Sequence, residues 1–189
     1  RTISADLVRI DGIAIGEGGD IFLSQADDFQ VRLLDSTGRE LGRTGRRGAG
    51  PGEFNTVGPV GRADSGYWVA DPLLSRVTLF TNRLKVARTL LLGAKGRRPG
   101  ERIVALGPGD TLVLARWEPV QLGSVGGSRR YSILAPGSDS AWEFASLPAF
   151  SDCQASDKLT TIRVPFCLRP LSDVASDGSL VVSVTHGPG

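Results

Sequence analysis

Residues 66–71 read Gly-Tyr-Trp-Val-Ala-Asp and residues 76–80 read Arg-Val-Thr-Leu-Phe, two apolar runs separated by a short turn. A second version of this pattern lies about 46 residues earlier, at 19–25 and 30–34. Short runs rich in aromatic and β-branched residues indicate β-strands. A repeat of about 40–50 residues built from such strands is typical of the blades of a β-propeller.

A second block of sequence repeats at a similar spacing. Residues 45–54 contain Gly-Arg-Arg followed by Pro-Gly-Glu, and residues 96–102 contain both elements again. Two independent blocks with nearly the same spacing are hard to reconcile with chance. We expect repeat units at 12–54, 55–102, 103–147 and 171–189, with a cysteine-containing insertion at 148–170.

The expected fold class is all-β: one partial β-propeller domain over residues 1–189, with four-stranded antiparallel blades. In the second unit, the patterning predicts strands near 56–63, 67–70, 76–81 and 85–92. About three and a half blades do not close a ring, since propellers have about four to eight. We therefore expect six blades in all and the rest of the propeller to lie outside this chain.

These motifs together resemble the NHL-repeat propellers. The resemblance rests on Gly-Pro-Gly-Glu-Phe at 50–54, Gly-Arg-Ala-Asp at 61–64, and the two runs at 66–71 and 76–80. The first string is similar to that of six-bladed propellers from uncharacterised bacterial exported families. The third unit lacks the Asp and the Arg of the pattern. The resemblance implies a six-bladed ring and leaves the function open, because propellers carry many unrelated activities.

The composition fits many short strands joined by turns. The 189 residues are 40% hydrophobic and 22% charged, with 25 Gly and 11 Pro. A net charge of +2 is too small to imply a polyanionic partner by itself. No apolar run approaches the roughly 20 residues that a membrane span needs.

The two cysteines, Cys153 and Cys167, lie 14 positions apart and outside any CxxC motif. His186 is the single histidine, which argues against a zinc site and against a catalytic base. A disulfide between the cysteines is the favoured interpretation, and two unpaired thiols are the alternative. A disulfide predicts a periplasmic or extracellular location.

Asp71 and Arg76 form the most regular charged pair, and Gln25 and Gln30 occupy the equivalent positions in the first unit. A carboxylate with a guanidinium, or an amide with an amide, can satisfy one contact. We interpret both as structural pairs that touch across the hairpin between the second and third strands of each blade.

Four arginines, Arg46, Arg47, Arg97 and Arg98, fall in equivalent interblade loops and are expected on one face of the disc. With Arg39, Arg43 and Arg102 nearby, they are candidates for an anion- or partner-binding patch. Solvated loop arginines are the favoured interpretation. The loops lack the aromatic residues that single-stranded RNA recognition uses, and Glu53 and Glu101 offset part of the charge.

Three carboxylates near the ends of predicted strands, Asp11, Asp64 and Asp173, are weak candidates for Ca²⁺ ligands at a central channel. Turn and strand-end acids that bond the local backbone are the favoured interpretation, so no cofactor is expected. The three tryptophans, Trp68, Trp117 and Trp142, are expected to pack between blades.

The favoured function is a non-enzymatic, exported propeller module that binds a protein or glycan partner, without nucleic acid and without catalytic residues. The first alternative is a metal-dependent enzyme of the lactonase or lyase type. The second is anion or nucleic-acid binding through the Arg-rich loops.

Overall fold

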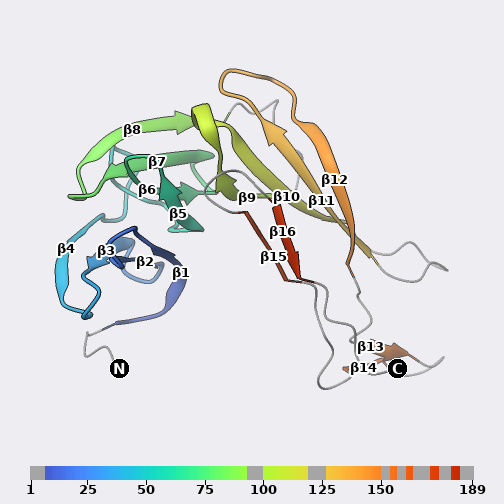
Figure 1. Ribbon diagram of the computed structural model, residues 1–189, viewed down its shortest axis with the longest axis horizontal. Helices are drawn as coiled ribbons and strands as arrows, with labels where there is room; N and C mark the ends of the chain where they lie inside the picture. The colour runs from blue at the N-terminus through green and yellow to red at the C-terminus, as the bar shows by residue number, and fades with distance from the viewer. Residues whose placement is uncertain are drawn as a thin grey trace.

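The computed structural model describes residues 7–92, 100–118, 127–149, 154–156, 161–163, 171–174 and 180–183. The fold is all-β, with three four-stranded antiparallel sheets that follow one another along the chain (Figure 1). The first sheet has β1 (Ile10–Ile15), β2 (Ile21–Gln25), β3 (Gln30–Leu34) and β4 (Glu40–Thr44). The second has β5 (Val60–Ala63), β6 (Gly66–Asp71), β7 (Arg76–Thr81) and β8 (Val86–Leu91). The third has β9 (Glu101–Leu106), β10 (Leu112–Glu118), β11 (Gly127–Leu134) and β12 (Trp142–Ala149).

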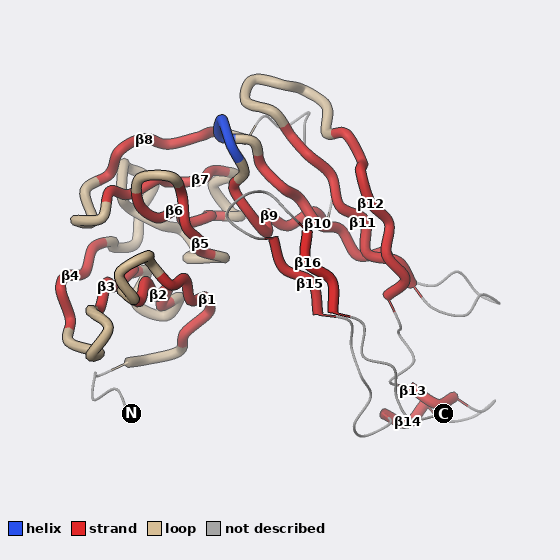
Figure 2. Tube along the Cα trace, in the orientation of Figure 1, coloured by secondary structure: helices blue, strands red, loops and turns tan. Residues whose placement is uncertain are grey.

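Two smaller pairs follow, β13 (Gln154–Ser156) with β14 (Thr161–Arg163) and β15 (Leu171–Val174) with β16 (Leu180–Ser183). Within the described part, the one helix is the three-residue 3-10 helix η1 (Pro108–Asp110), and no helix is long and apolar enough to cross a membrane. Figure 2 shows strands joined by loops through most of this part of the chain.

Each four-stranded sheet is a meander in which every strand pairs with the next one along the chain. Every residue of β6 is buried, as expected for a central strand covered on both faces by neighbouring sheets. The fourth strand β8 is mostly exposed. The first strands of consecutive sheets, β1, β5 and β9, lie against one another, and β15 contacts β9. The first strand of each sheet is therefore the inner one, and the sheets are consecutive blades of a partial β-propeller.

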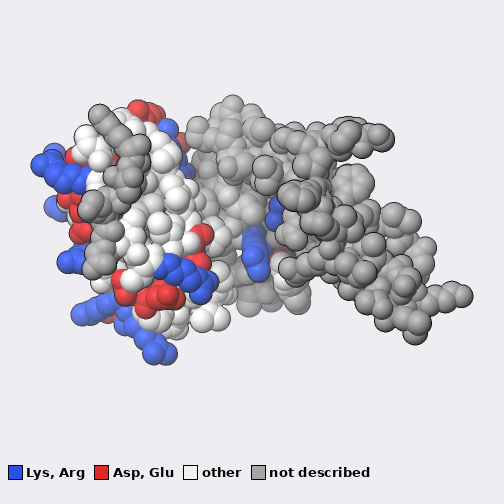
Figure 3. All heavy atoms as spheres, turned by 90° about the horizontal axis from the view of Figure 1, so that it is seen from below, with Lys and Arg blue, Asp and Glu red and all other residues white. Residues whose placement is uncertain are grey.

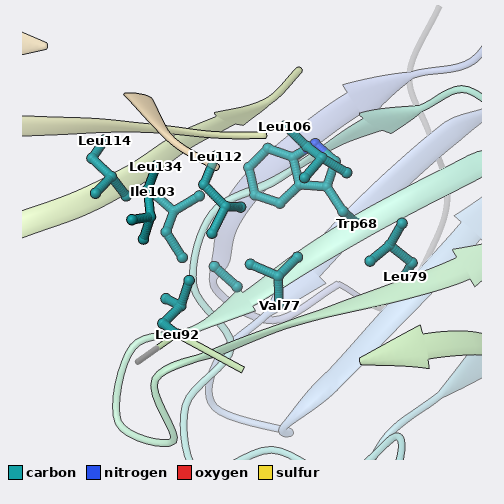
Figure 4. Packing of buried hydrophobic residues seen from close by; sticks show 10 residues of the cluster. Trp68, Val77, Leu79, Leu92, Ile103, Leu106, Leu112, Leu114 and Leu134 are labelled. Atoms are coloured by element: carbon teal, nitrogen blue, oxygen red, sulfur yellow. The ribbon is translucent and has the colours of Figure 1, made fainter. Parts of the chain in front are cut away.

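Two of the three hydrophobic clusters in the described part of the chain lie between blades, and the third is formed by the third blade alone. Phe22 and Val31 of the first blade pack with Phe80 of the second and with Phe54 from the connection between them. A second cluster joins the second and third blades, as Figure 4 shows. In it, Trp68, Val77, Leu79 and Leu92 meet Ile103, Leu106, Leu112, Leu114 and Leu134.

The predicted fold class is confirmed. The bounds of the four strands of the second unit lie within one residue of the expected ones, except that β5 begins four residues later than predicted. The three tryptophans differ in their burial. Trp68 is 2% exposed in the core between the second and third blades, as expected. Interblade packing is wrong for Trp117 and Trp142, which are 49% and 68% exposed. Trp142 begins the edge strand β12 and stacks on Phe144 at 6.4 Å, so its partner comes from its own strand.

Candidate functional site

The antiparallel meander places loops alternately at the two ends of each blade. One end carries the turns at 16–20, 35–39, 64–65 and 82–85, which we call the turn face. The other end carries the turns at 26–29 and 72–75 and the interblade connection 45–59, which we call the connection face. Each candidate residue can be assigned to one of these faces.

Arg46 and Arg47 lie on the connection face, and both have partners within the chain. Arg46 forms an ion pair with Glu53, with Nη2 at 2.5 Å and Nε at 2.7 Å from Oε1. Glu53 Oε2 also accepts a hydrogen bond of 2.8 Å from the Gly50 amide. This bond, followed by the Arg46 guanidinium, lowers the pKa of Glu53. The Arg47 guanidinium lies over the ring of Phe29, 5.6 Å from its centroid.

The glycines of this connection leave room for the Glu53 carboxylate. A Cβ atom on Gly48 would lie 2.2 Å from Glu53 Oε2, and one on Gly50 would lie 2.9 Å from it. The Gly-rich string is therefore explained by local packing around the Glu53 carboxylate.

Arg39 belongs to the β3–β4 turn on the opposite face and pairs with Asp35, so it cannot join Arg46 in a basic patch. On the face in Figure 3, basic and acidic side chains of the described part are interspersed.

Asp71 and Arg76 are register partners of β6 and β7, but they form no ion pair with each other. Asp71 Oδ2 accepts a 2.7 Å hydrogen bond from the Asn55 amide, and Oδ1 accepts bonds of 3.1 and 3.0 Å from the amides of Leu73 and Leu74. The side chain therefore bonds to backbone on both sides of it.

The Arg76 guanidinium donates to three carbonyl groups of the same connection: Ala49 at 2.8 Å, Gly50 at 3.0 Å, and Glu53. The predicted contact between the two side chains is therefore wrong, because both of them bind backbone groups instead. The backbone of the connection offers amides to the acid and carbonyls to the base, so each side chain pairs with peptide groups. The pair clamps the interblade connection onto the second blade.

Gln25 and Gln30 are also register partners, in β2 and β3. Gln25 is fully buried, and its Nε2 donates to the carbonyl of Val8 at 3.4 Å rather than to Gln30. Gln25 thus holds the segment that leads into β1, as Asp71 holds the segment that leads into β5. The expected amide–amide contact is replaced by a contact with backbone.

A polar recess opens on the turn face between the first two blades. Its volume is about 140 Å³, and its lining comes from the β1–β2 turn, the end of β5, the β5–β6 turn, the start of β6 and the β7–β8 turn. The lining residues are Gly16, Glu17, Gly18, Asp20, Arg62, Asp64, Gly66, Tyr67 and Asn82. Sites for drug-sized ligands span about 300–1,000 Å³, so this recess suits one small polar group.

The Tyr67 hydroxyl is the most distinctive group of the recess. The residue is 3% exposed, and its ring stacks on Phe22 with centroids 4.5 Å apart. Its hydroxyl lines the recess and has no hydrogen-bond partner among the described residues. Burial, followed by the nearby charge of Asp20, raises the pKa of Tyr67, whereas Arg62 acts in the opposite direction. The hydroxyl therefore keeps its proton at neutral pH and is available to a ligand.

Charged groups line the recess unevenly. Arg62 donates to Glu17 at 2.7 Å, an ion pair that joins residues 45 positions apart in sequence. Asp20 and Asp64 make no hydrogen bond or ion pair with any residue that the structure describes. One arginine thus faces three carboxylates, and two of these carboxylates lack a positively charged partner.

The candidate Ca²⁺ ligands are not brought together. Asp11 lies at the connection-face end of β1 and pairs with Arg9 at 2.9 Å, whereas Asp64 follows β5 at the turn face. β1 and β5 run in the same direction, so a residue at the start of β1 and a residue after the end of β5 lie at opposite ends of the blades. Asp173 lies in β15. Within the described ranges, no group of three or more His, Cys, Asp or Glu side chains is arranged to hold a metal ion.

The remaining candidates lie outside the described residues: Arg97, Arg98, Cys153, Cys167 and His186. The recess itself was missed from the sequence. Its residues come from two consecutive units, and the motifs at 61–64 and 66–71 mark only residues that the second unit supplies.

No protein-family model and no curated protein matches the chain. Among solved structures, it is similar to a streptogramin B lyase, at 15% identity over 92% of this chain and 53% of that chain, with a TM-score of 0.45. It is also similar to the virginiamycin B lyase of Staphylococcus aureus, at 11% identity over 92% and 62%, with a TM-score of 0.46. The hydrazine synthase of Kuenenia stuttgartiensis is 15% identical over 79% and 39%, with a TM-score of 0.44.

The chain therefore spans about two fifths to three fifths of the length of these three chains. At this level of identity and TM-score, none of the three bears on the activity of this protein. The blades and the recess between the first two of them define a partial propeller with a polar candidate site.

Proposed function

We propose that this chain is part of a non-enzymatic, exported propeller module that binds a glycan through the recess on the turn face. One observation carries the proposal: the recess has polar groups whose hydrogen-bonding capacity is unused within the described chain. These groups are the Tyr67 hydroxyl, the carboxylates of Asp20 and Asp64, and the amide of Asn82. The Tyr67 side chain is 3% exposed, and its hydroxyl is the end that reaches the recess, where a ligand or water can complete its hydrogen bonds.

A glycan fits this recess better than a protein surface does. Sugar hydroxyls both donate and accept, and the carboxylates, the amide and the phenol offer both functions in return. A stable protein interface buries about 800 Å² on each partner, with aromatic anchors at its centre. The aromatic ring in the recess is already covered by Phe22, which leaves only its hydroxyl for contact.

The alternative functions have less support from the described residues. A lactonase- or lyase-type site needs convergent metal ligands, and Asp11 and Asp64 lie at opposite ends of their strands. Nucleic-acid binding needs arginines that are available to phosphate. Arg46 is paired with Glu53, and Arg47 lies on Phe29.

The proposal includes the six-bladed NHL-type ring and the periplasmic or extracellular location. In support of the repeat on which the ring depends, the glycines of the two Pro-Gly-Glu strings both have a positive φ, 73° at Gly52 and 83° at Gly100. The location depends on a disulfide between Cys153 and Cys167. Mass spectrometry of the alkylated protein with and without reductant tests it: two thiols that alkylate without reductant contradict the disulfide.

Ligand-detected NMR with a panel of glucose, galactose, mannose and glucosamine tests glycan binding. We expect at least one sugar to bind, and Tyr67→Phe to weaken that binding because it removes only the hydroxyl. Tyr131→Phe is the matched control, since Tyr131 is also buried but lies in the third blade. Binding that is absent for every sugar, or equal in wild type and Tyr67→Phe, contradicts the proposal.

A further inference from the structure

We propose that the group entering the recess is positively charged, and that the ligand is an amino sugar whose ammonium contacts Asp20 and Asp64. This inference rests on the proposed function and narrows its ligand class. Its basis is the charge of the lining together with the Tyr67 hydroxyl, the unpartnered polar end of a side chain that is 3% exposed, which points to a ligand independently of the acids.

The charges of the recess do not cancel. Arg62 is already engaged by Glu17 at 2.7 Å, so this pair contributes little net field. Asp20 and Asp64 remain without a cation among the described residues. Asp20 is half-buried, and a carboxylate in such a position is stabilised by an opposite charge within a few ångströms. A neutral ligand would leave both charges uncompensated.

The arrangement favours an organic ammonium over a metal ion. Ca²⁺ takes about six to eight oxygen ligands at about 2.3–2.6 Å, and the described acids form no such group. An ammonium donates three hydrogen bonds, and its oxygen partners lie farther from the nitrogen and from one another than the oxygen ligands of Ca²⁺ lie from the metal and from one another. Two carboxylates and either the Tyr67 phenol oxygen or the Asn82 amide oxygen supply the three acceptors.

The phenol explains why a sugar is preferred to a simple amine. Tyr67 keeps its proton, so its hydroxyl donates to a ring oxygen or a neighbouring hydroxyl while its lone pairs accept from the ammonium. Gly16 lines the recess without a side chain and so leaves the hydroxyl uncovered, since a Cβ atom there would lie 2.3 Å from it. The volume of about 140 Å³ suits the charged end of one sugar unit rather than a whole oligosaccharide.

Calorimetric titration with four compounds separates the contributions: glucosamine, N-acetylglucosamine, glucose and n-butylammonium. We expect glucosamine to bind about tenfold more tightly than glucose or N-acetylglucosamine, which lack the positive charge. We expect n-butylammonium to bind more weakly than glucosamine because it lacks the hydroxyl groups. High salt should weaken glucosamine binding and leave glucose binding nearly unchanged.

Asp64→Asn removes one charge and keeps the shape of an exposed side chain that forms no bond in the described structure. We expect it to weaken glucosamine binding about fivefold and glucose binding much less, because the amide still hydrogen-bonds a hydroxyl; a folding defect would not produce this selective effect. Asp139→Asn is the matched control, because Asp139 is exposed in the third blade, outside the recess. Its titrations should match those of the wild type.

The outcomes distinguish this inference from the proposed function. Equal binding of glucosamine and glucose, unaffected by Asp64→Asn, overturns the ammonium site and leaves glycan binding in place. Binding of n-butylammonium alone overturns both the amino sugar and the glycan function, and leaves only an ammonium contact of the kind that a lysine side chain makes. Failure of all four compounds overturns both.

Discussion

Gly16 and Tyr67 depend on each other at the floor of the recess. A Cβ atom on Gly16 would lie 2.3 Å from the Tyr67 hydroxyl, whereas the nearest ring carbon would be 3.5 Å away. Gly16→Ala should therefore lower the free energy of unfolding by about 1–3 kcal/mol, the usual cost of overpacking. Adding Tyr67→Phe should recover much of this loss, because it removes the clashing oxygen.

Urea unfolding of the two single variants and the double variant measures this coupling. The single variant Tyr67→Phe serves as the reference for loss of the hydroxyl alone. Strict additivity of the two substitutions would show that the hydroxyl and the position of Gly16 do not touch.

Asp71 contributes more to the free energy of unfolding than an ordinary surface carboxylate does. It is fully buried and accepts hydrogen bonds from the amides of Asn55, Leu73 and Leu74. Asp71→Ala leaves these donors without a partner, so we expect a loss of about 2–3 kcal/mol in the free energy of unfolding. Asp139→Ala, at an exposed position, should change it by less than about 0.5 kcal/mol. Equal urea midpoints for the two variants would rule out the clamp.

At the scale of the element, the β3–β4 hairpin contains a carboxylate whose contribution to stability depends on pH in the acid range. Asp35 Oδ1 accepts from the Thr37 hydroxyl at 2.5 Å, the Thr37 amide at 2.9 Å and the Arg39 amide at 3.0 Å. The Thr37 hydroxyl bond is the largest cause that lowers the pKa of Asp35, from 3.8 to about 2. The folded state therefore holds the charged form more strongly than the unfolded chain does.

Because the folded pKa is the lower one, this stabilisation is complete above the unfolded value and is lost as the pH falls from about 4 through 2. We expect the urea midpoint of the wild type to exceed that of Asp35→Asn at neutral pH, and the difference to shrink on acidification. Thr37→Ala should reduce the pH dependence, since it removes the hydroxyl bond. A difference between wild type and Asp35→Asn that stays constant with pH would contradict this account.

At the scale of the whole molecule, the blades are joined by interblade clusters and connections. Phe54 is fully buried between the first and second blades, in contact with Phe80 at 6.4 Å between centroids. Phe54→Ala should cost about 3–5 kcal/mol through the cavity it leaves. In a repeat architecture each unit contacts mainly its neighbours, so the loss should be greatest in the first blade.

Hydrogen exchange checks this directly. Amides of β2 and β3 should exchange faster in Phe54→Ala, and amides of β10 should be affected much less. Leu114→Ala, within the cluster of the second and third blades, is the mirror-image control. Uniform acceleration through all three blades in both variants would mean that the molecule opens only as one unit.

Much of the blade structure could be predicted because its signals are local. The runs at 66–71 and 76–80 became β6 and β7 with nearly the expected bounds. The repeated Pro-Gly-Glu strings were found, but they have different roles. Glu53 lies in a connection and pairs with Arg46, whereas Glu101 is buried at the start of β9. Similar sequence therefore did not imply a similar environment.

The sequence by itself determined the strands, their antiparallel order and the repetition of blades, because alternating burial and turn chemistry act over a few residues. Only the tertiary structure decided which groups meet. It turned the pair Asp71 and Arg76 toward the backbone of a connection, and it joined Glu17 to Arg62 across two blades. Such contacts depend on how one sheet packs on the next, which no local pattern encodes. The recess with its unpartnered Tyr67 hydroxyl exists for the same reason.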